Sequence, residues 1–542
     1  MPVSFVRKEL AEMLWIYWII RDCLAGEPAI KGWLAGGAMT NISQNAAAFN
    51  GGGDGLQFNK SQMSKARRYL PMPNAEDQSI ENQRRYESYV ARAIWYPVTS
   101  RTLEGMVGQI FLINPITEVP KQLEPMLKDL DGQGLSFEQS GKRATRYGMG
   151  YGRAGLWTDY PITNGAVTQQ QQDSGVVKPM IKLIAPWNIV NWSTTSIEGK
   201  EVLTKVVIRE ECDSFPEDED DFSIYDEEKY HVLRLDSVTG DYTVQTYDGE
   251  KLTTGIQNKA NFTPGDVVTP KDAKGQSFKY IPFAFIGSEN NDSDVDKPQM
   301  YDMAALNVGH YRNSADYEES SHQCGQPTVW VTGLDEQWLN TVLKGTISIG
   351  SRGGIPLPPG AQIGLLQADP NTMPLEAMKL KEDQMLAIGA KLVTQKRAQR
   401  TATEAVFDAS SEGSVLTTVA VNVSSAYEFA FKAAAQFAGA DGSGIKIALN
   451  TQFELNKLSP DDVSKVVASW FEGAISFTEM RGVMRKSGYA EQDDATAREE
   501  IKKDRADGMI PPATLPKGAG GGNPNPNADP AGHATNPATR GQ

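Results

Sequence analysis

The segment GYGRAGLWTDYP, residues 150–161, decides how the chain is interpreted. Its first six residues match G-x-G-x-x-G, the pyrophosphate fingerprint of dinucleotide-binding enzymes. Such a site needs a strand, then the glycine turn, then a helix, because the free N–H groups at the helix N-terminus bind the anion. The order of the patterns around these glycines therefore separates a nucleotide site from a tight turn.

The patterns around the glycines come in the reverse order. Ser136 and Gln139 form a capping box, which predicts a helix from Phe137 to about Tyr147. After the glycines, RAGLWTDYP is typical of a strand that ends at Pro161. A phosphate would then face the wrong end of a helix. We expect the glycines to break a helix and let the chain turn, and we predict no cofactor site here.

Residues 155–290 are predicted to be mostly β. Strand patterns occur at MIKLI (from 180), VLTKVVI (from 202), KYHVLRL (from 229) and DYTVQTY (from 241). The last two flank the turn DSVTG, which predicts a hairpin. The acidic run 217–221 lacks the spacing and the glycine of a calcium loop, so we favour a solvated loop over a calcium site.

Helical patterns occupy most of the remaining chain. They cover residues 75–111, 300–324 and the Ala-rich segment 415–437. A brief helix capped by Asp335 carries Trp338, Leu339, Val342 and Leu343, and a long helix is marked by Leu375, Met378, Met385 and Leu392. Short helices are predicted after Ser459 and Ser476. TVWVTG (from 328) and QIGLLQA (from 362) are predicted strands. Residues 35–63 are predicted to be a loop or arm, and 511–542 a disordered tail.

An apolar run, MLWIYWII, lies near the N-terminus at residues 13–20. A bilayer-spanning helix needs about 20 apolar residues, so this run is too short. Arg21 and Asp22 follow it directly, without a clear signal-peptide cleavage site. We expect a buried helix, and we expect Trp15 and Trp18, like Met378 and Met385, to serve the core or a subunit interface.

The composition limits the function classes. A length of 542 residues predicts two to four structural units. A net charge of −15 argues against a protein that grips DNA over its whole surface, because DNA affinity comes mainly from Lys and Arg. Three widely spaced cysteines predict neither a disulfide framework nor a zinc site, and they favour a reducing compartment.

Catalytic and metal-binding patterns are sparse. Of the four histidines, His310 and His322 are twelve residues apart, too far for one metal site, and His533 lies in the predicted tail. His231 has no nearby cysteine or carboxylate at metal-ligand spacing. DLDGQGLSFEQS, residues 129–140, begins like an EF-hand loop but has Ser140 where a bidentate Glu is needed. No Walker A, G-x-S-x-G, CxxC or HExxH motif occurs. We predict no catalytic and no metal-binding residues. An enzyme whose catalytic residues lie far apart in the sequence stays open at this point, although no pattern argues for one.

The order of several segments resembles that of the portal proteins of tailed bacteriophages. These segments are YLP (69–71), ESYVARAIWYPVTSRTLEGMVGQIF (87–111), DLDGQG (129–134), YGRAGLWTDYP (151–161), LNVGHYRNSADYEESSHQCGQPTVWVTG (306–333), EDQMLAIGAKLV (382–393) and TATEA (401–405). Each segment alone is weak evidence for the resemblance, whereas the order of all of them from about Tyr69 to Arg505 is specific to these portal proteins. In this resemblance, GYGRAGLW is a helix-to-strand joint.

The resemblance implies a function. Portal proteins form a ring, usually of twelve copies, at one vertex of the capsid, the portal vertex of the virion, after assembly in the host cytoplasm. Double-stranded DNA passes through the channel in both directions without sequence specificity. The implied partners are other copies of the chain, the major capsid protein, scaffolding protein, the large terminase subunit and a head-completion or tail adaptor protein. No catalytic activity, cofactor or membrane is implied.

The resemblance also implies an α+β, multi-domain fold with a mixed α/β wing, a helical stem, a small clip and a helical crown. The implied divisions are 1–68 (N-terminal helix and arm), 69–297 (wing), 298–345 (stem, clip, stem), 346–448 (wing return with the tunnel-loop region), 449–510 (crown) and 511–542 (tail). Asp335–Leu343 would start the second stem helix. The stem candidates are Met303, Leu306, His310, Tyr317 and Trp338, and the clip candidates are Thr328, Val329, Trp330, Val331 and Thr332. Clip strands of this family pair between subunits.

A channel through which DNA moves should not bind it tightly, because each phosphate that a Lys or Arg side chain neutralises slows the release of DNA. The negative net charge of the chain agrees with this role. We place Lys396, Arg397, Arg400, Thr401, Ser410 and Ser411 near the tunnel constriction as a hypothesis; a solvated helix end is the alternative for the basic residues. Two other functions stay open: a nucleotide-binding enzyme, suggested by GYGRAG, and another head–tail adaptor of the virion.

Overall fold

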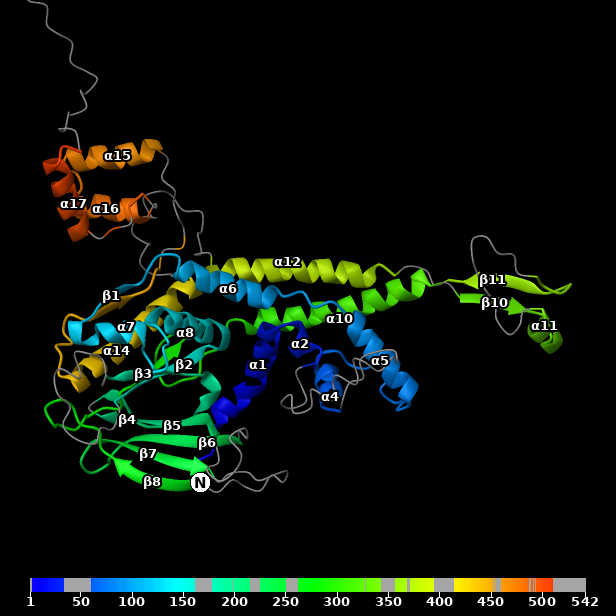
Figure 1. Ribbon diagram of the computed structural model, residues 1–542, viewed down its shortest axis with the longest axis horizontal. Helices are drawn as coiled ribbons and strands as arrows, with labels where there is room; N and C mark the ends of the chain where they lie inside the picture. Colours follow the sequence, from blue (N-terminus) through cyan, green and yellow to red (C-terminus); the bar gives the residue numbers. More distant parts are fainter. Residues whose placement is uncertain are drawn as a thin grey trace, which may run out of the picture. The chain divides into compact units, whose positions relative to one another are not determined.

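The computed structural model describes residues 2–33, 60–160, 178–197, 199–214, 225–249, 262–326, 328–342, 356–367, 371–393, 414–451, 453, 460–486, 489–490, 492 and 494–509 (Figure 1). Contacts divide the chain into two compact units, Met1–Phe453 and Glu454–Gln542. Both helices and strands occur, which confirms the α+β class.

The helices are α1 (Lys8–Ala25), α2 (Glu27–Ile30), α4 (Lys60–Tyr69), α5 (Ile80–Arg92), α6 (Val98–Ile110), α7 (Glu124–Lys128), α8 (Phe137–Tyr151), α10 (Tyr301–Gly325), α11 (Glu336–Thr341), α12 (Met373–Val393), α14 (Val415–Ala438), α15 (Pro460–Phe471), α16 (Phe477–Lys486) and α17 (Asp494–Ala506). The strands are β1 (Ile116–Glu118), β2 (Arg153–Asp159), β3 (Met180–Ile184), β4 (Ile189–Ile197), β5 (Lys200–Ser214), β6 (Tyr225–Leu235), β7 (Tyr242–Gly249), β8 (Phe262–Val268), β9 (Phe283–Gly287), β10 (Thr328–Thr332), β11 (Gln362–Leu366) and β12 (Lys446–Ala448).

The glycine segment joins α8 to β2, as predicted. Ser136 accepts a hydrogen bond from the Gln139 amide, and the Gln139 side chain accepts one from the Ser136 amide, so the capping box is present. The helix runs four residues beyond the predicted end, to Tyr151, and Gly152 closes it in the left-handed conformation with φ +72°. Glycine adopts this conformation without steric cost. The helix therefore presents its C-terminus, not its N-terminus, to the glycines.

Two antiparallel sheets fill the predicted β-rich region and confirm it. A three-stranded sheet has the order β3–β2–β9, with Gly155 opposite both Ile184 and Phe285. A five-stranded sheet follows in the order β4–β5–β6–β7–β8, and β6–β7 is the predicted hairpin. The helix α14 packs against β2 and β9 (Figure 1).

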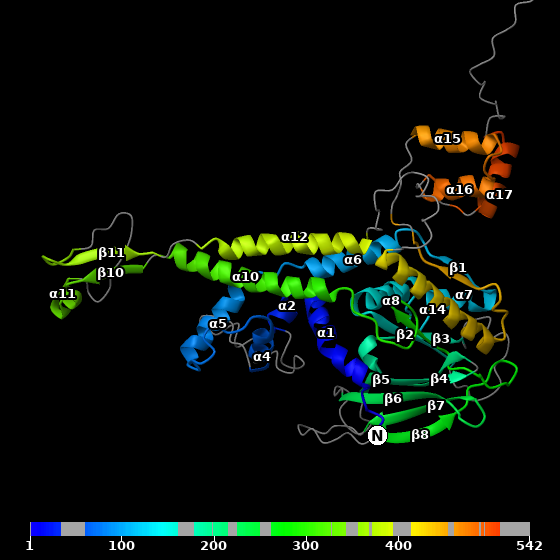
Figure 2. The ribbon, with the colours of Figure 1, turned by 180° about the vertical axis from the view of Figure 1, so that it is seen from behind.

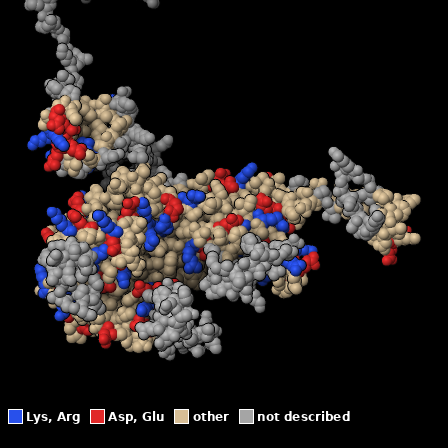
Figure 3. Space-filling model, viewed as in Figure 1, with Lys and Arg blue, Asp and Glu red and all other residues tan. Residues whose placement is uncertain are grey.

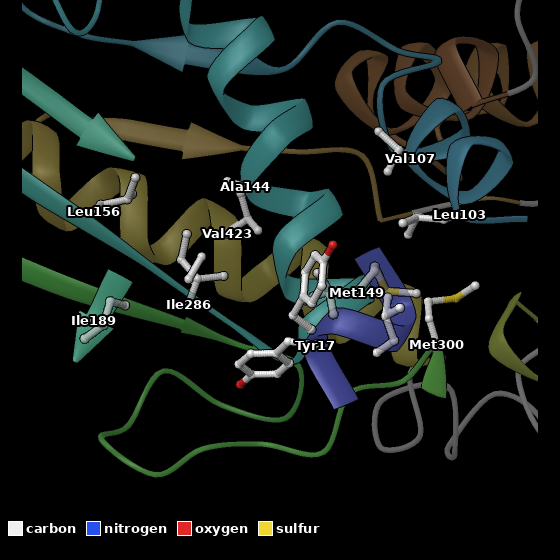
Figure 4. Close-up of a cluster of buried hydrophobic side chains, with 14 of the residues drawn as sticks. Tyr17, Leu103, Val107, Ala144, Met149, Leu156, Ile189, Ile286, Met300 and Val423 are labelled. Carbon is white, nitrogen blue, oxygen red and sulfur yellow. The ribbon is translucent and has the colours of Figure 1, made fainter. Parts of the chain in front are cut away.

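The core of the first unit joins segments that are far apart in the sequence. Figure 4 shows side chains of α6, α8, α14 and three strands meeting in one cluster: Leu103, Val107, Ala144, Met149, Leu156, Ile189, Ile286 and Val423. Complete burial of a Val, Leu, Ile or Met side chain stabilises a fold by about 1.5–3 kcal/mol. This cluster therefore fixes α8 and β2, and with them the glycine joint between them.

The helix α1 is only half buried, which corrects the expectation of a buried helix. Leu10, Tyr17 and Ile20 are fully buried, whereas Trp15 and Trp18 are 52% and 43% exposed. The two faces differ because only one packs against the core, in contact with α6, α8 and α10. Among the described residues, no helix is long and apolar enough to cross a membrane.

The predicted helical region 75–111 forms two helices, α5 and α6, rather than one. The break lies at residues 93–97, and Pro97 is the residue that precedes α6. Proline disfavours the helical conformation of the residue before it and has no N–H to continue a helix, which accounts for the interruption.

Arg153, the first residue of β2, is 1% exposed and lies between two aromatic rings. Its guanidinium carbon is 4.2 Å from the ring centres of both Trp192 and Phe285, and its Nη1 donates to the carbonyl oxygens of Ser293 and Asp294 at 3.0 and 2.6 Å. Burial lowers the pKa of the guanidinium to about 10. The side chain stays protonated at neutral pH, and cation–π contacts and carbonyl oxygens offset the cost of burying it.

Asp159, at the end of β2, makes the stability of the first unit depend on pH. Burial raises the pKa of its carboxyl above the ordinary value of 3.8. A carboxyl whose pKa is raised by folding stabilises the folded state at pH values below 3.8. This contribution to the free energy of unfolding is lost as the pH rises through the raised pKa. We expect Asp159→Asn to raise the free energy of unfolding at pH 7 and to change it little at pH 3. Urea unfolding of both proteins across this range measures the difference.

Asp236 provides a control of opposite sign. Its Oδ1 accepts hydrogen bonds from the amides of Thr239 and Val238, which lower the pKa of the carboxyl. The Asp236 carboxyl therefore stabilises the folded state at pH values above its ordinary pKa, and this stabilisation is lost as the pH falls through the lowered pKa. Asp236→Asn should therefore destabilise the protein at pH 7. If Asp159→Asn behaved in the same way, the burial argument would be wrong.

Candidate functional site: a helix pair and its strand tip

The helices α10 and α12 lie side by side in both views and contact each other along their length; we call them the helix pair (Figures 1 and 2). The sequence predicted α10 and also α12, but the resemblance implied that the second stem helix, which returns along the first, starts at Asp335–Leu343. The structure corrects this placement, because the helix that packs on α10 is α12. The helix after Asp335, α11, ends at Thr341 after six residues and is too short to match α10.

The base of α10 is anchored by a buried asparagine. Asn307 is fully buried, and its Oδ1 accepts from the Thr99 hydroxyl at 2.8 Å and from the Thr99 amide at 3.3 Å. Its Nδ2 donates to the Tyr96 carbonyl oxygen at 2.8 Å. These bonds tie α10 to the start of α6, so the helix pair has a fixed base in the first unit.

Further contacts hold the next turns of α10 to residues 69–94. Arg312 donates to the carbonyl oxygen of Tyr69 at 2.8 Å, and the Tyr89 hydroxyl donates to Asp316 at 2.6 Å. Arg92 forms an ion pair with Glu319. Residues 321–326, beyond this pair, are exposed or partly exposed. The first five turns are thus anchored, and the last turns lead to the strand tip.

Polar contacts also join the two helices of the pair. His310 is 3% exposed, and its Nε2 lies 3.1 Å from Oε1 of Glu382 on α12. Lys381 donates to Oδ1 of Asn313 at 2.6 Å. A Cβ on Gly309 would lie 3.1 Å from the Lys381 side chain, so this glycine permits the close approach. The pair is therefore held by specific contacts as well as by apolar packing.

Asn307→Ala is expected to lower the free energy of unfolding by about 2–4 kcal/mol, because the Thr99 and Tyr96 groups lose their partner in a buried place. Urea unfolding followed by circular dichroism measures this loss. Gln323→Ala is the control, since its side chain makes an exposed hydrogen bond to Glu319 on the same helix. The control should change stability by less than about 0.5 kcal/mol. Equal losses would contradict the anchoring role of Asn307.

The strand tip comprises β10, α11 and β11. β10 and β11 pair antiparallel over five residues each, with Val329 opposite Leu365 and Val331 opposite Ile363. Residues directly opposite share one side of a sheet, so these four side chains form an apolar face. Ile363 is 44% exposed and Leu365 is 63% exposed. Most described atoms of the tip are uncharged on the side that Figure 3 shows.

The pairing within the tip shows where the clip candidates lie. Thr328, Val329, Trp330, Val331 and Thr332 form the whole of β10, which confirms the strand predicted at this segment, whereas their role in a clip stays a prediction. Their strand partner in the structure is β11 of the same chain. Trp330 covers Gly364, because a Cβ there would come within 2.6 Å of the indole. Both strands leave one edge unpaired within this two-stranded sheet, and such edges accept further strands.

The stem candidates divide between two elements. Met303, Leu306, His310 and Tyr317 all lie on α10, and Met303 and His310 are buried. Trp338 lies on α11 instead, where its indole donates to the carbonyl oxygen of Pro356 at 3.1 Å. It therefore belongs to the strand tip and not to the helix pair. Gly333, with φ +79°, turns the chain after β10, and Asp335 caps α11 as predicted.

Several predicted segments lie outside the described residues. They are the tunnel candidates Lys396, Arg397, Arg400, Thr401, Ser410 and Ser411, the acidic run 217–221, residues 35–59 of the predicted arm and the tail at 511–542. Their roles stay predictions. Residues 60–63, the end of the predicted arm, belong to α4 instead.

The carboxylates of the EF-hand-like segment are engaged by the protein itself. Asp129 forms an ion pair with Lys178 at 2.6 Å and accepts from the Gly134 amide at 2.8 Å, and Asp131 accepts from the Gln133 amide at 2.9 Å. His231 Nε2 lies 2.6 Å from Oε2 of Glu210 on the neighbouring strand. Among the described residues, no group of three His, Cys, Asp or Glu side chains could hold a metal ion.

Sequence patterns missed the anchor Asn307, although a signal was available. Met303, Asn307 and Tyr311 are spaced by four residues and share the buried face of α10. A polar residue in a buried stripe needs hydrogen-bond partners, which indicates a specific contact. Glu382, the partner of His310, gave no comparable signal, because its position against α10 depends on the packing of the two helices.

Comparisons with known proteins match the chain to a family model and to chains of solved structures. Residues 299–438 match a family model described as "Domain of unknown function (DUF4055)"; this range includes α10, the strand tip and α12, and ends with α14. One matched chain is in the solved structure "Virion of native gene transfer agent (GTA) particle", with 12% identity, a TM-score of 0.36, and coverage of 75% of this chain and 93% of that chain. A similarity of this size carries no inference about function. No curated protein matches the chain.

Proposed function

We propose that this chain is a structural protein of a virion and, more specifically, a portal protein that forms a ring of about twelve copies at one capsid vertex. The ring is a channel for DNA packaging and ejection and a platform for terminase and for a head-completion or tail adaptor protein. Major capsid and scaffolding proteins surround it during assembly. The order of motifs from Tyr69 to Arg505 supports this proposal.

The observation that carries the proposal is the helix pair with its strand tip. A long helix leads to a two-stranded sheet, and a second long helix returns along the first. The two-stranded sheet keeps large apolar side chains exposed, and isolated two-stranded sheets are marginally stable in water. A neighbouring copy in a ring would cover this tip, which suits a stem and clip.

The charge also agrees with a DNA conduit. With a net charge of −15 per chain, a ring is strongly acidic, and an acidic or neutral wall releases DNA easily. The hypothesis that Lys396, Arg397 and Arg400 line the narrowest part of the tunnel belongs to this proposal. Charge reversal at these three residues should alter DNA packaging or retention, and unchanged packaging would argue against their place in the tunnel.

The proposal includes no catalytic activity and no cofactor. GYGRAG spans the last two residues of α8 and the first three of β2, so a helix precedes the glycines and a strand follows them, which does not suit a dinucleotide. A ligand that binds only the native state raises the melting temperature. We expect no rise with NAD, NADP, FAD or ATP, measured by differential scanning fluorimetry. A saturable rise that Gly150→Ala abolished would favour the nucleotide-binding alternative.

Light scattering of the purified protein tests ring formation directly. The proposal predicts a mass near twelve copies of the 59.2-kDa chain. A single chain or a dimer, both alone and after addition of scaffolding and capsid proteins, would contradict it.

A further inference from the structure

The second unit contains a pocket that the proposed function does not use. The helices α15, α16 and α17 line an open pocket of about 650 Å³, within the range of ligand pockets. Trp470 and Phe477 pack edge to face in its wall, with ring centres 5.7 Å apart. Met480 and Met484 are 7% and 8% exposed and lie beside them. The wall is therefore mainly apolar, with aromatic rings and flexible thioethers.

The charged residues that line this pocket are all basic. They are Arg481, Arg498 and Lys502, on α16 and α17. Arg481 donates from Nη2 to the carbonyl oxygen of Gln492 at 3.0 Å, and its buried Nε has no hydrogen-bond partner. The Arg498 guanidinium lies 5.0 Å from the centre of the Phe477 ring. Within the described residues, neither Arg498 nor Lys502 forms an ion pair, so both can accept an anion.

The apolar wall and the basic residues together favour a ligand that has an apolar side chain flanked by carboxylates. An apolar wall binds an aliphatic or aromatic side chain, and a basic rim binds carboxylates next to it. Methionine side chains adapt to helices of different sequence, which is their use at other peptide-binding surfaces. The basic residues also repel a basic peptide.

Nucleic acid fits this pocket less well. Non-specific binding of single strands uses aromatic faces on which bases stack. Here Trp470 and Phe477 pack edge to face against each other, and Arg498 covers a face of Phe477. The buried methionines offer nothing to a phosphate or sugar.

We propose that this pocket in the second unit is a docking site for an acidic peptide segment of a partner protein, anchored by an apolar side chain and flanked by carboxylates. The site lies within the second unit alone and does not depend on ring formation. It goes beyond the proposed channel function by assigning this unit a protein partner of defined chemistry.

Fluorescence anisotropy with the full-length protein tests this site. The probe is a labelled sixteen-residue helical peptide with Leu and Phe on one face and Glu on both sides of them. We expect saturable binding that weakens at least tenfold when the Glu residues are replaced by Gln, and at least tenfold when Leu and Phe are replaced by Ser. The double variant Arg498→Glu, Lys502→Glu should weaken binding of the original peptide at least tenfold.

Lys503→Glu is the matched control, because Lys503 is exposed next to Lys502 but does not line the pocket. It should change binding less than threefold. Tyr489→Ala removes a 55% exposed ring from the wall and should weaken binding without unfolding the unit. Circular dichroism of each variant checks the fold.

Three results would overturn the proposal: no saturable binding of the acidic peptide, an equal loss with Lys503→Glu, or tighter binding of a single-stranded DNA of equal charge that depends on Arg498 and Lys502. The last result would assign the pocket to nucleic acid. Light scattering of the same samples reports ring formation separately, so failure of this inference is distinguishable from failure of the portal proposal.

Discussion

Gly152→Ala is expected to lower the free energy of unfolding by about 2–5 kcal/mol. Two costs add. A non-glycine residue in the left-handed conformation costs about 1–2 kcal/mol, and Gly152 has φ +72°. A Cβ there would also lie 2.7 Å from the Asp296 carbonyl oxygen and 2.9 Å from that of Lys297, and overpacking costs about 1–3 kcal/mol. Both contacts are backbone atoms, which cannot rotate away. Urea unfolding measures the change.

Gly150→Ala provides the matched control within the same hexapeptide. Gly150 lies inside α8, and a Cβ there would meet only Leu103 Cδ2 at an ordinary 3.6 Å. Alanine is favoured over glycine in a helix by about 0.5–1 kcal/mol, so this variant should be as stable as the wild type or more stable. If the hexapeptide were a nucleotide-binding loop, both glycines would be needed for function, and the two variants would not be expected to differ in this way. Similar losses for both variants would contradict the helix-to-strand assignment.

Ile363→Glu with Leu365→Glu is expected to abolish ring assembly and to leave the single chain folded. Both side chains belong to the apolar face of the strand tip and are exposed in the isolated chain, so their replacement costs little folding energy. In the proposed ring, a neighbouring copy covers this face. Two carboxylates per chain would then be desolvated and close to those of the neighbours, which disfavours association. Light scattering should show a fall from about twelve copies to one, with an unchanged circular dichroism spectrum.

Thr332→Glu with Gln362→Glu is the control for this pair. These residues are opposite each other on the other side of the same two strands. The change in charge is the same, but the apolar face is intact, so rings should still form. Loss of rings in both double variants would indicate a general charge effect and not an interface at the apolar face.

Local signals were sufficient to predict the elements that decide the fold. The capping box at Ser136 fixed the start of α8, and the following glycines placed its end before a strand. Turn residues between two alternating runs predicted β6–β7, and Asp335 predicted the start of α11. These features depend on contacts within a few residues, which the sequence displays directly.

The remaining features depend on contacts that no local pattern displays. The return helix was misplaced because the choice of partner for α10 depends on packing across the segment that separates α10 from α12. The burial of Arg153 between Trp192 and Phe285 joins three strands, and a lone Arg in an apolar strand does not identify its partners. The exposure of Trp15 and Trp18 likewise follows from which face of α1 meets the core.

Single-particle imaging of the purified protein is the most direct test of the portal proposal. The proposal predicts rings of about twelve copies with a central channel wide enough for a DNA duplex, and with the helix pairs arranged around that channel. Single chains or dimers that form no ring even with scaffolding and capsid proteins present would contradict it. Rings that carried the strand tips on the outer rim, without contact between neighbouring tips, would contradict the assignment of the helix pair and its tip.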